Sequence, residues 1–143
     1  FRETVTELGR IKQMVFGGFE KCLYPVQKFD SDTERRFSVL AERDAMKWFK
    51  PVKGQFQIYY KRGNEQPEYV PDFVVEMDDA ILMVETKARN EMDNEEVRAK
   101  ASAAQTWCTY TSDYNAQFGS KPWRYVLIAH DDVTETKRIV DFM

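Results

Sequence analysis

The chain is poor in the residues from which histidine- and cysteine-based metal sites are built. Its single histidine, His130, excludes a site made mainly of histidines. Its two cysteines, Cys22 and Cys108, lie far apart and lack the spacing of metal ligands. A structural zinc site is therefore not expected, and both cysteines are expected to be reduced thiols of a cytoplasmic protein.

The chain also lacks long apolar runs. None approaches the length of a membrane span, no secretory leader is visible, and there is no repeat or low-complexity segment. At 143 residues, the sequence predicts a single domain over residues 1–143 that is large enough to bury a core. Because it begins at Phe1 rather than Met, we expect a piece excised from a larger multidomain protein, with processing as the alternative.

There is no large excess of one charge. The 21 basic and 24 acidic residues give a net charge of −3 and a pI near 5.3, which argues against tight autonomous DNA binding. Basic residues nevertheless gather between Arg43 and Arg62, with aromatic residues interleaved. This stretch could lie against a phosphate backbone; the alternative is a solvated face with core aromatics between the charges.

Apolar periodicity and turn residues predict a mixed α/β sandwich around one sheet. The helices are expected over residues 4–16, from Ser31 to about Trp48, from about 95 to 114, and over 134–142 with Asp131 and Asp132 as caps. The strands are expected over residues 55–61, 73–77, 80–84 and 124–129, and extended or irregular chain over 19–29.

Two neighbouring predicted strands, YVPDFVVEM and AILMVETKA, carry acids and a lysine at one end. Asp78-Asp79 suits a two-residue hairpin loop between them. A turn centred there places Asp72 opposite Glu85, with Cβ atoms about 4.5–5.5 Å apart. Because strand side chains alternate, Lys87 projects on the same side as Glu85. The other face of the hairpin is wholly apolar and consists of Phe73, Val75, Met77, Ala80, Leu82 and Val84.

Opposed carboxylates repel each other unless a cation lies between them. Mg²⁺ takes carboxylate, carbonyl and water oxygens and can share phosphate oxygens with a substrate. We therefore expect Asp72 and Glu85 to bind Mg²⁺, for which Mn²⁺ should substitute, with the Thr86 carbonyl as a third ligand. Lys87 would neutralise a scissile phosphate or orient the attacking water. The alternative is an exposed strand end with incidental charges.

The segment PDFVVEMDDAILMVETKAR resembles the core of the PD-(D/E)xK nuclease superfamily, which includes many restriction endonucleases and repair nucleases. The resemblance implies a restriction endonuclease-like fold, with a mixed sheet flanked by helices. It also implies metal binding by Asp72 and Glu85, a catalytic role for Lys87, and a metal role for Glu34 on an upstream helix. The residues alone leave an alternative for Glu34, since Ser31-x-x-Glu34 is a capping box in which the glutamate reaches back to the Ser31 N–H.

Over most of its length, the chain is similar in layout to the C-terminal endonuclease domain of type III restriction subunits and related helicase–nuclease proteins. This similarity implies a DNA endonuclease module of an ATP-driven restriction or phage-defence protein, with a helicase or ATPase domain in the same chain or complex. A repair or recombination nuclease is one alternative, and a nucleic-acid-binding module with a vestigial site is another. Weaker candidates for DNA contacts, each with a solvated surface position as the alternative, are Arg89, Lys100, Gln105, Lys53, Lys61 and Arg62.

Overall fold

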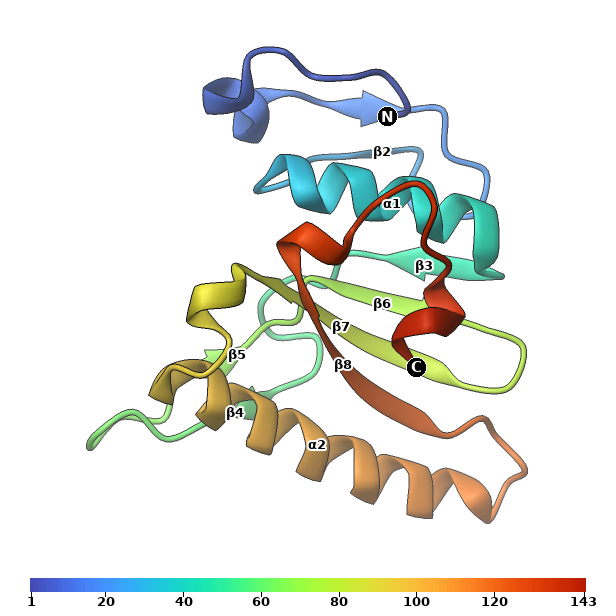
Figure 1. Ribbon diagram of the computed structural model, residues 1–143. Helices are drawn as coiled ribbons and strands as arrows, with labels where there is room; N and C mark the ends of the chain where they lie inside the picture. Colours follow the sequence, from blue (N-terminus) through green and yellow to red (C-terminus); the bar gives the residue numbers. More distant parts are fainter.

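The computed structural model describes residues 1–143 and has a mixed four-stranded sheet between two α-helices (Figure 1). The strand order is β3-β6-β7-β8; β7 and β8 are parallel, and the other neighbours are antiparallel. These elements are β3 (Lys47–Phe49), β6 (Phe73–Glu76), β7 (Ile81–Lys87), β8 (Trp123–Ala129), α1 (Asp32–Asp44) and α2 (Glu95–Ala116). The predicted α/β fold around one main sheet is therefore confirmed.

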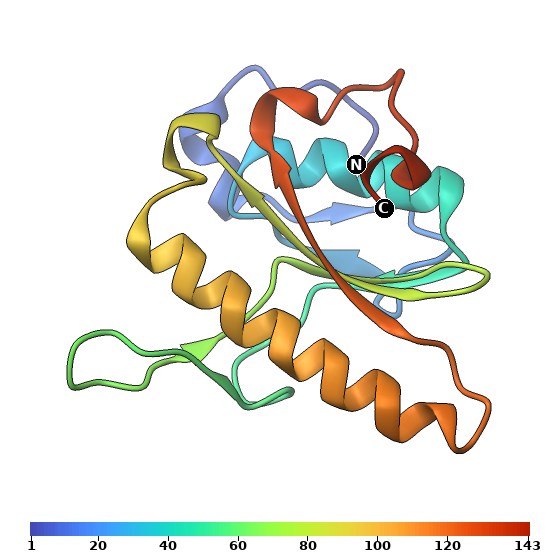
Figure 2. The same ribbon diagram turned by 60° about the horizontal axis from the view of Figure 1, so that its bottom comes forward.

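Two small sheets and four 3₁₀ helices complete the fold. They are β1 (Phe16–Gly17) with β2 (Val26–Gln27), β4 (Ile58–Tyr59) with β5 (Glu68–Tyr69), η1 (Leu8–Gln13), η2 (Arg89–Glu91), η3 (His130–Asp132) and η4 (Ile139–Phe142). The two views in Figures 1 and 2 place β4 and β5 beside α2, on the side of the sheet opposite α1. None of the helices combines the length and the apolar character needed to cross a membrane.

Hydrophobic clusters cover both faces of the sheet. On the α1 side, the Phe73 ring lies 4.7 Å from the ring of Phe37 and 5.8 Å from that of Trp48, measured between centroids. On the α2 side, Met83 is fully buried and packs in a cluster that includes Ala104. The hairpin of β6 and β7 is therefore held between two cores, and this packing fixes the position of its open end.

The predicted register of this hairpin is confirmed. Phe73 pairs with Val84, and the Met77 N–H donates to the Ala80 carbonyl over 2.8 Å, which closes a two-residue loop. All six residues of the face that was predicted to be wholly apolar are buried in the hydrophobic cluster on the α1 side. One further step along the ladder brings Asp72 level with Glu85.

The long helix α2 and the strand β8 also follow the sequence prediction. The Asn94 side chain caps α2 by accepting a hydrogen bond from the Val97 N–H (2.8 Å), and the helix then runs to Ala116. A helical crossover of this kind is what allows β7 and β8 to lie parallel. Together these elements bring the ends of β7 and β8 to the same edge of the sheet.

The helix predicted from Ser31 to about Trp48 ends earlier, and β3 follows it. Ala45 is already extended, and the Met46 N–H donates to the Glu76 carbonyl over 2.8 Å. The Trp48 side chain is almost fully buried in the hydrophobic cluster on the α1 side of the sheet. Pairing with β6 and burial of the indole outweigh the weak local preference for helix.

The helix predicted over residues 4–16 is wrong apart from η1. Of the residues in η1, only Ile11 is buried, and Leu8 is 55% exposed. Helices in proteins depend mainly on packing of an apolar face, which this segment lacks.

The strand predicted over residues 55–61 shrinks to the two residues of β4. Gln57 has a φ of 54°, in the left-handed region, so the extended run is broken just before the strand. The remaining strand pairs only with β5.

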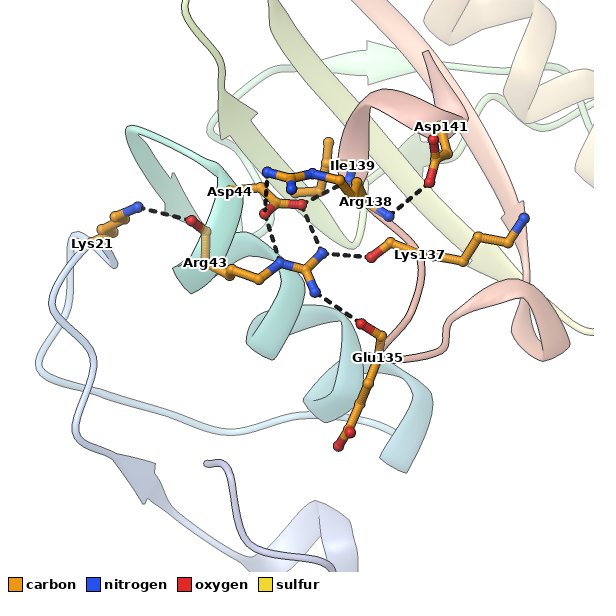
Figure 3. A network of polar contacts seen from close by, with 8 residues as sticks. All are labelled: Lys21, Arg43, Asp44, Glu135, Lys137, Arg138, Ile139 and Asp141. Carbon is orange, nitrogen blue, oxygen red and sulfur yellow. Dashed lines mark hydrogen bonds and ion pairs between the residues drawn. The ribbon is translucent and has the colours of Figure 1, made fainter.

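The predicted C-terminal helix does not form beyond the short η4, because α1 binds its main chain (Figure 3). The Arg43 guanidinium donates to the carbonyl of Glu135 over 2.9 Å and to the carbonyl of Lys137. The Asp44 carboxylate accepts from the Ile139 N–H over 3.0 Å. Main-chain groups that a helix would pair internally are thus used to dock the C-terminal segment.

Candidate active site

Asp72 lies just before β6 and is held by the neighbouring strand. Its Oδ2 accepts two hydrogen bonds of 2.9 Å, one from the Thr86 N–H and one from the Thr86 hydroxyl. Its other oxygen has no hydrogen-bond partner within the chain. The two bonds orient the carboxylate and leave one oxygen available for a ligand.

Glu85 is buried on β7, with 8% of its surface exposed. The Tyr69 hydroxyl, from β5, donates to its Oε1 over 2.8 Å, and Oε2 has no partner within the chain. Burial, followed by the negative charge of Asp72, raises the pKa of Glu85 to about 8; the Tyr69 hydrogen bond and the charges of Lys87 and Lys100 oppose this rise. Near neutral pH, the site therefore favours a proton or a cation beside Glu85.

Lys87 is the last residue of β7 and is half-buried. It makes no ion pair or side-chain hydrogen bond in the structure, and its charge lowers the pKa of Glu85. It is thus a cation free to meet an anionic group brought to Asp72 and Glu85.

Glu34 lies in the first turn of α1 and contacts both the helix cap and a lysine. The predicted cap is present in part: Ser31 Oγ accepts from the Glu34 N–H over 3.2 Å. The Glu34 carboxylate, however, accepts from the N–H of Asp30 rather than that of Ser31, and its Oε1 lies 2.6 Å from the Lys50 ammonium. Burial raises the pKa of Glu34, Lys50 opposes the rise, and the charge of Asp72 adds to it.

The donor set suits a hard divalent cation. Asp72 and Glu85 each keep one carboxylate oxygen without an intramolecular partner, and the Thr86 carbonyl is a further oxygen on the same strand. No three His, Cys, Asp or Glu side chains gather into a metal cage. Mg²⁺ does not require such a cage, because it is commonly bound through one or two carboxylates together with waters and substrate phosphates.

The site is not enclosed. Asp72, Glu85 and Lys87 line none of the five best-defined cavities of the molecule. The half-buried Asp72 and Lys87 leave the end of the hairpin reachable from one side. An edge of this kind suits an extended polymer better than a small molecule, for which an enclosed pocket is usual.

The candidates for DNA contacts on the β7–α2 side have different environments. Arg89 makes ion pairs with Asp131 (3.0 Å) and Asp132 (2.9 Å). These two residues are not the predicted helix caps, because they belong to η3 and the next helix, η4, begins only at Ile139. Lys100 lies 3.7 Å from a Glu96 oxygen. Gln105 is exposed on α2.

The remaining basic candidates lie around β4 and β5. Lys53 and Lys61 are exposed, whereas Arg62 pairs with Glu65 (2.9 Å) and approaches Glu96 (3.5 Å). Arg43 binds the main chain of the C-terminal segment and Lys50 pairs with Glu34, so neither joins the exposed Lys53 and Lys61 in one continuous basic face.

Two residues at the site escaped the sequence prediction. Tyr69 is one, and nothing in its immediate sequence marks it as a partner of Glu85. Lys50 is the other, because the sequence predicts a helix up to about Trp48, immediately before it. In the register of β3 against β6, Phe49 lies opposite Val74, so Lys50 comes level with Phe73 and next to Asp72. Recognition of β3 would have placed it at the site.

Comparison of the chain with protein-family models, with curated proteins and with solved structures gives no significant match. The function is therefore inferred from the residues and their geometry.

Proposed function

We propose that this domain is a Mg²⁺-dependent DNA endonuclease that hydrolyses phosphodiester bonds, with a restriction endonuclease-like fold. The observation that carries the proposal is the end of the β6–β7 hairpin. There, two carboxylates come level, each with an oxygen that has no partner within the chain, beside an unpaired lysine. The raised pKa of Glu85 supports it, because a buried carboxylate next to another is stabilised by a bound cation.

In this proposal Asp72 and Glu85 hold Mg²⁺ through their free oxygens, with the Thr86 carbonyl as a further ligand. When bound, the cation supplies charge stabilisation at the scissile phosphate and makes a coordinated water more acidic. Tyr69 fixes the orientation of Glu85. Lys87 neutralises charge on the phosphate or orients the attacking water.

The surroundings of the site support a module that depends on another domain for DNA affinity. The chain carries a net charge of −3, and the cations of Arg62 and Arg89 are paired with nearby acids. DNA binding relies on cations that neutralise phosphates. We therefore place this domain beside a helicase or ATPase of a cytoplasmic restriction or phage-defence system, in the same chain or complex.

The experiment is cleavage of supercoiled and linear DNA with Mg²⁺, Mn²⁺ or EDTA. We expect weak metal-dependent cutting, and a loss of at least about a hundredfold in Asp72→Ala and Lys87→Ala. Lys12→Ala, an exposed lysine on η1, is the matched control and should cut like the wild type. Full activity of Lys87→Ala with metal present would exclude the proposed site. Branched substrates cut in preference to both would favour a repair nuclease.

A vestigial site is separated from an active one by calorimetric titration with Mn²⁺. The proposal requires binding that Asp72→Ala abolishes. If the wild type takes up no Mn²⁺, or if Asp72→Ala leaves the affinity unchanged, the domain is a non-catalytic module.

A further inference from the structure

Lys50 places a largely buried positive charge beside the candidate active site. Its side chain is 12% exposed, and its ammonium lies 2.6 Å from Oε1 of Glu34, whose side chain is 6% exposed. The ammonium also donates to the main-chain carbonyl of Asp72 over 2.9 Å and lies 4.6 Å from the centre of the Phe73 ring. An ammonium has three donors, so two of them are used within the chain.

These contacts join three separate parts of the fold. Lys50 directly follows β3, Glu34 belongs to the first turn of α1, and Asp72 precedes β6. Because each partner is anchored in a packed element, the ammonium is held in place rather than free to swing toward DNA. A buried carboxylate such as Glu34 is costly without a partner, and Lys50 is the only cation that makes an ion pair with it.

We propose that the Lys50 ammonium is a resident cation on the Glu34 side of Asp72. Glu34 then holds Lys50 rather than a metal ion, and the site takes one divalent cation, at Asp72 and Glu85. This inference rests on the proposed function as far as the metal is concerned. A second divalent cation between Glu34 and Asp72 would meet the fixed ammonium at close range, where like charges repel.

The first test counts bound Mn²⁺ by calorimetry. We expect one ion in the wild type, and an affinity in Glu34→Gln within about threefold of the wild type. Lys50→Met removes the charge with a side chain only one atom shorter, so the variant should bind a second Mn²⁺. Lys53→Met, at an exposed lysine, is the control. Two ions in the wild type, one in Lys50→Met, or binding at least about tenfold weaker in Glu34→Gln would overturn the proposal.

The second test needs no metal and follows thermal unfolding in EDTA. Lys50→Met leaves Glu34 buried and unpaired, so we expect a larger fall in Tm than in the double variant Lys50→Met/Glu34→Gln. Shifts that simply add would show that the two residues are not coupled, and would refute the resident cation. A wild type that binds no Mn²⁺ but shows the coupling would overturn the nuclease proposal and leave Lys50 as the cation of Glu34.

Discussion

Replacing Glu85 by glutamine should stabilise the metal-free protein at alkaline pH. Glutamine has nearly the same shape, and its oxygen can still accept the hydrogen bond that the Tyr69 hydroxyl donates over 2.8 Å. It carries no charge to repel Asp72. In the wild type, burial and then the charge of Asp72 raise the pKa of Glu85 to about 8, against the opposing effects of the Tyr69 hydrogen bond, Lys87 and Lys100.

The sign of the pH dependence follows from the direction of this change. The folded protein holds the Glu85 proton up to about pH 8, whereas the unfolded chain loses it near 4.5. Protonation therefore favours folding: the contribution is complete below pH 4.5 and is lost as the pH rises through about 8. At about 1.4 kcal/mol per pH unit, the largest possible loss is about 5 kcal/mol, and rearrangement of the carboxylate toward water should reduce it to about 3 kcal/mol.

The assay is urea unfolding in EDTA, followed by tryptophan fluorescence, at several values between about pH 5 and 9. The difference in unfolding free energy between Glu85→Gln and the wild type isolates Glu85, because other groups titrate in both proteins. We expect this difference to grow by about 3 kcal/mol with pH, and Mg²⁺ to remove most of it by replacing the proton. Glu91→Gln, an exposed residue of η2, should show no such trend. A difference that stays constant with pH would refute the reasoning.

Two further changes test the packing around the site and the C-terminal segment. Tyr69→Phe removes the hydrogen bond to Glu85 and should cost about 1–2 kcal/mol of unfolding free energy and weaken Mn²⁺ binding; unchanged urea unfolding and calorimetry would contradict the contact. Asp44→Asn removes the charge from a carboxylate whose side chain is 4% exposed and which binds the Ile139 N–H (Figure 3). It should cost about 2–3 kcal/mol in the same unfolding assay, whereas Asp113→Asn, exposed on α2, should cost less than about 0.5 kcal/mol.

Elements with strong local patterns were predictable from the sequence. The β6–β7 hairpin alternates cleanly around a two-residue loop, and α2 has apolar residues at helical steps after a capping asparagine. The position of Asp72 opposite Glu85 follows from the register of this hairpin alone. The predictions failed where main-chain groups form hydrogen bonds with residues distant in the sequence instead of within a local helix. This happens at β3, which pairs with β6, and in the C-terminal segment, which Arg43 and Asp44 bind.

The sequence by itself determined the pair of acids, the lysine and their common strand end. These depend on alternation and on a short loop, which are properties of contiguous residues. Only the tertiary structure decided that Tyr69 would donate a hydrogen bond to Glu85, and that the Lys50 ammonium would lie between the Glu34 carboxylate and the Asp72 carbonyl. The reason is physical: burying a charge requires a partner close in space, and that partner comes from whichever element packs there.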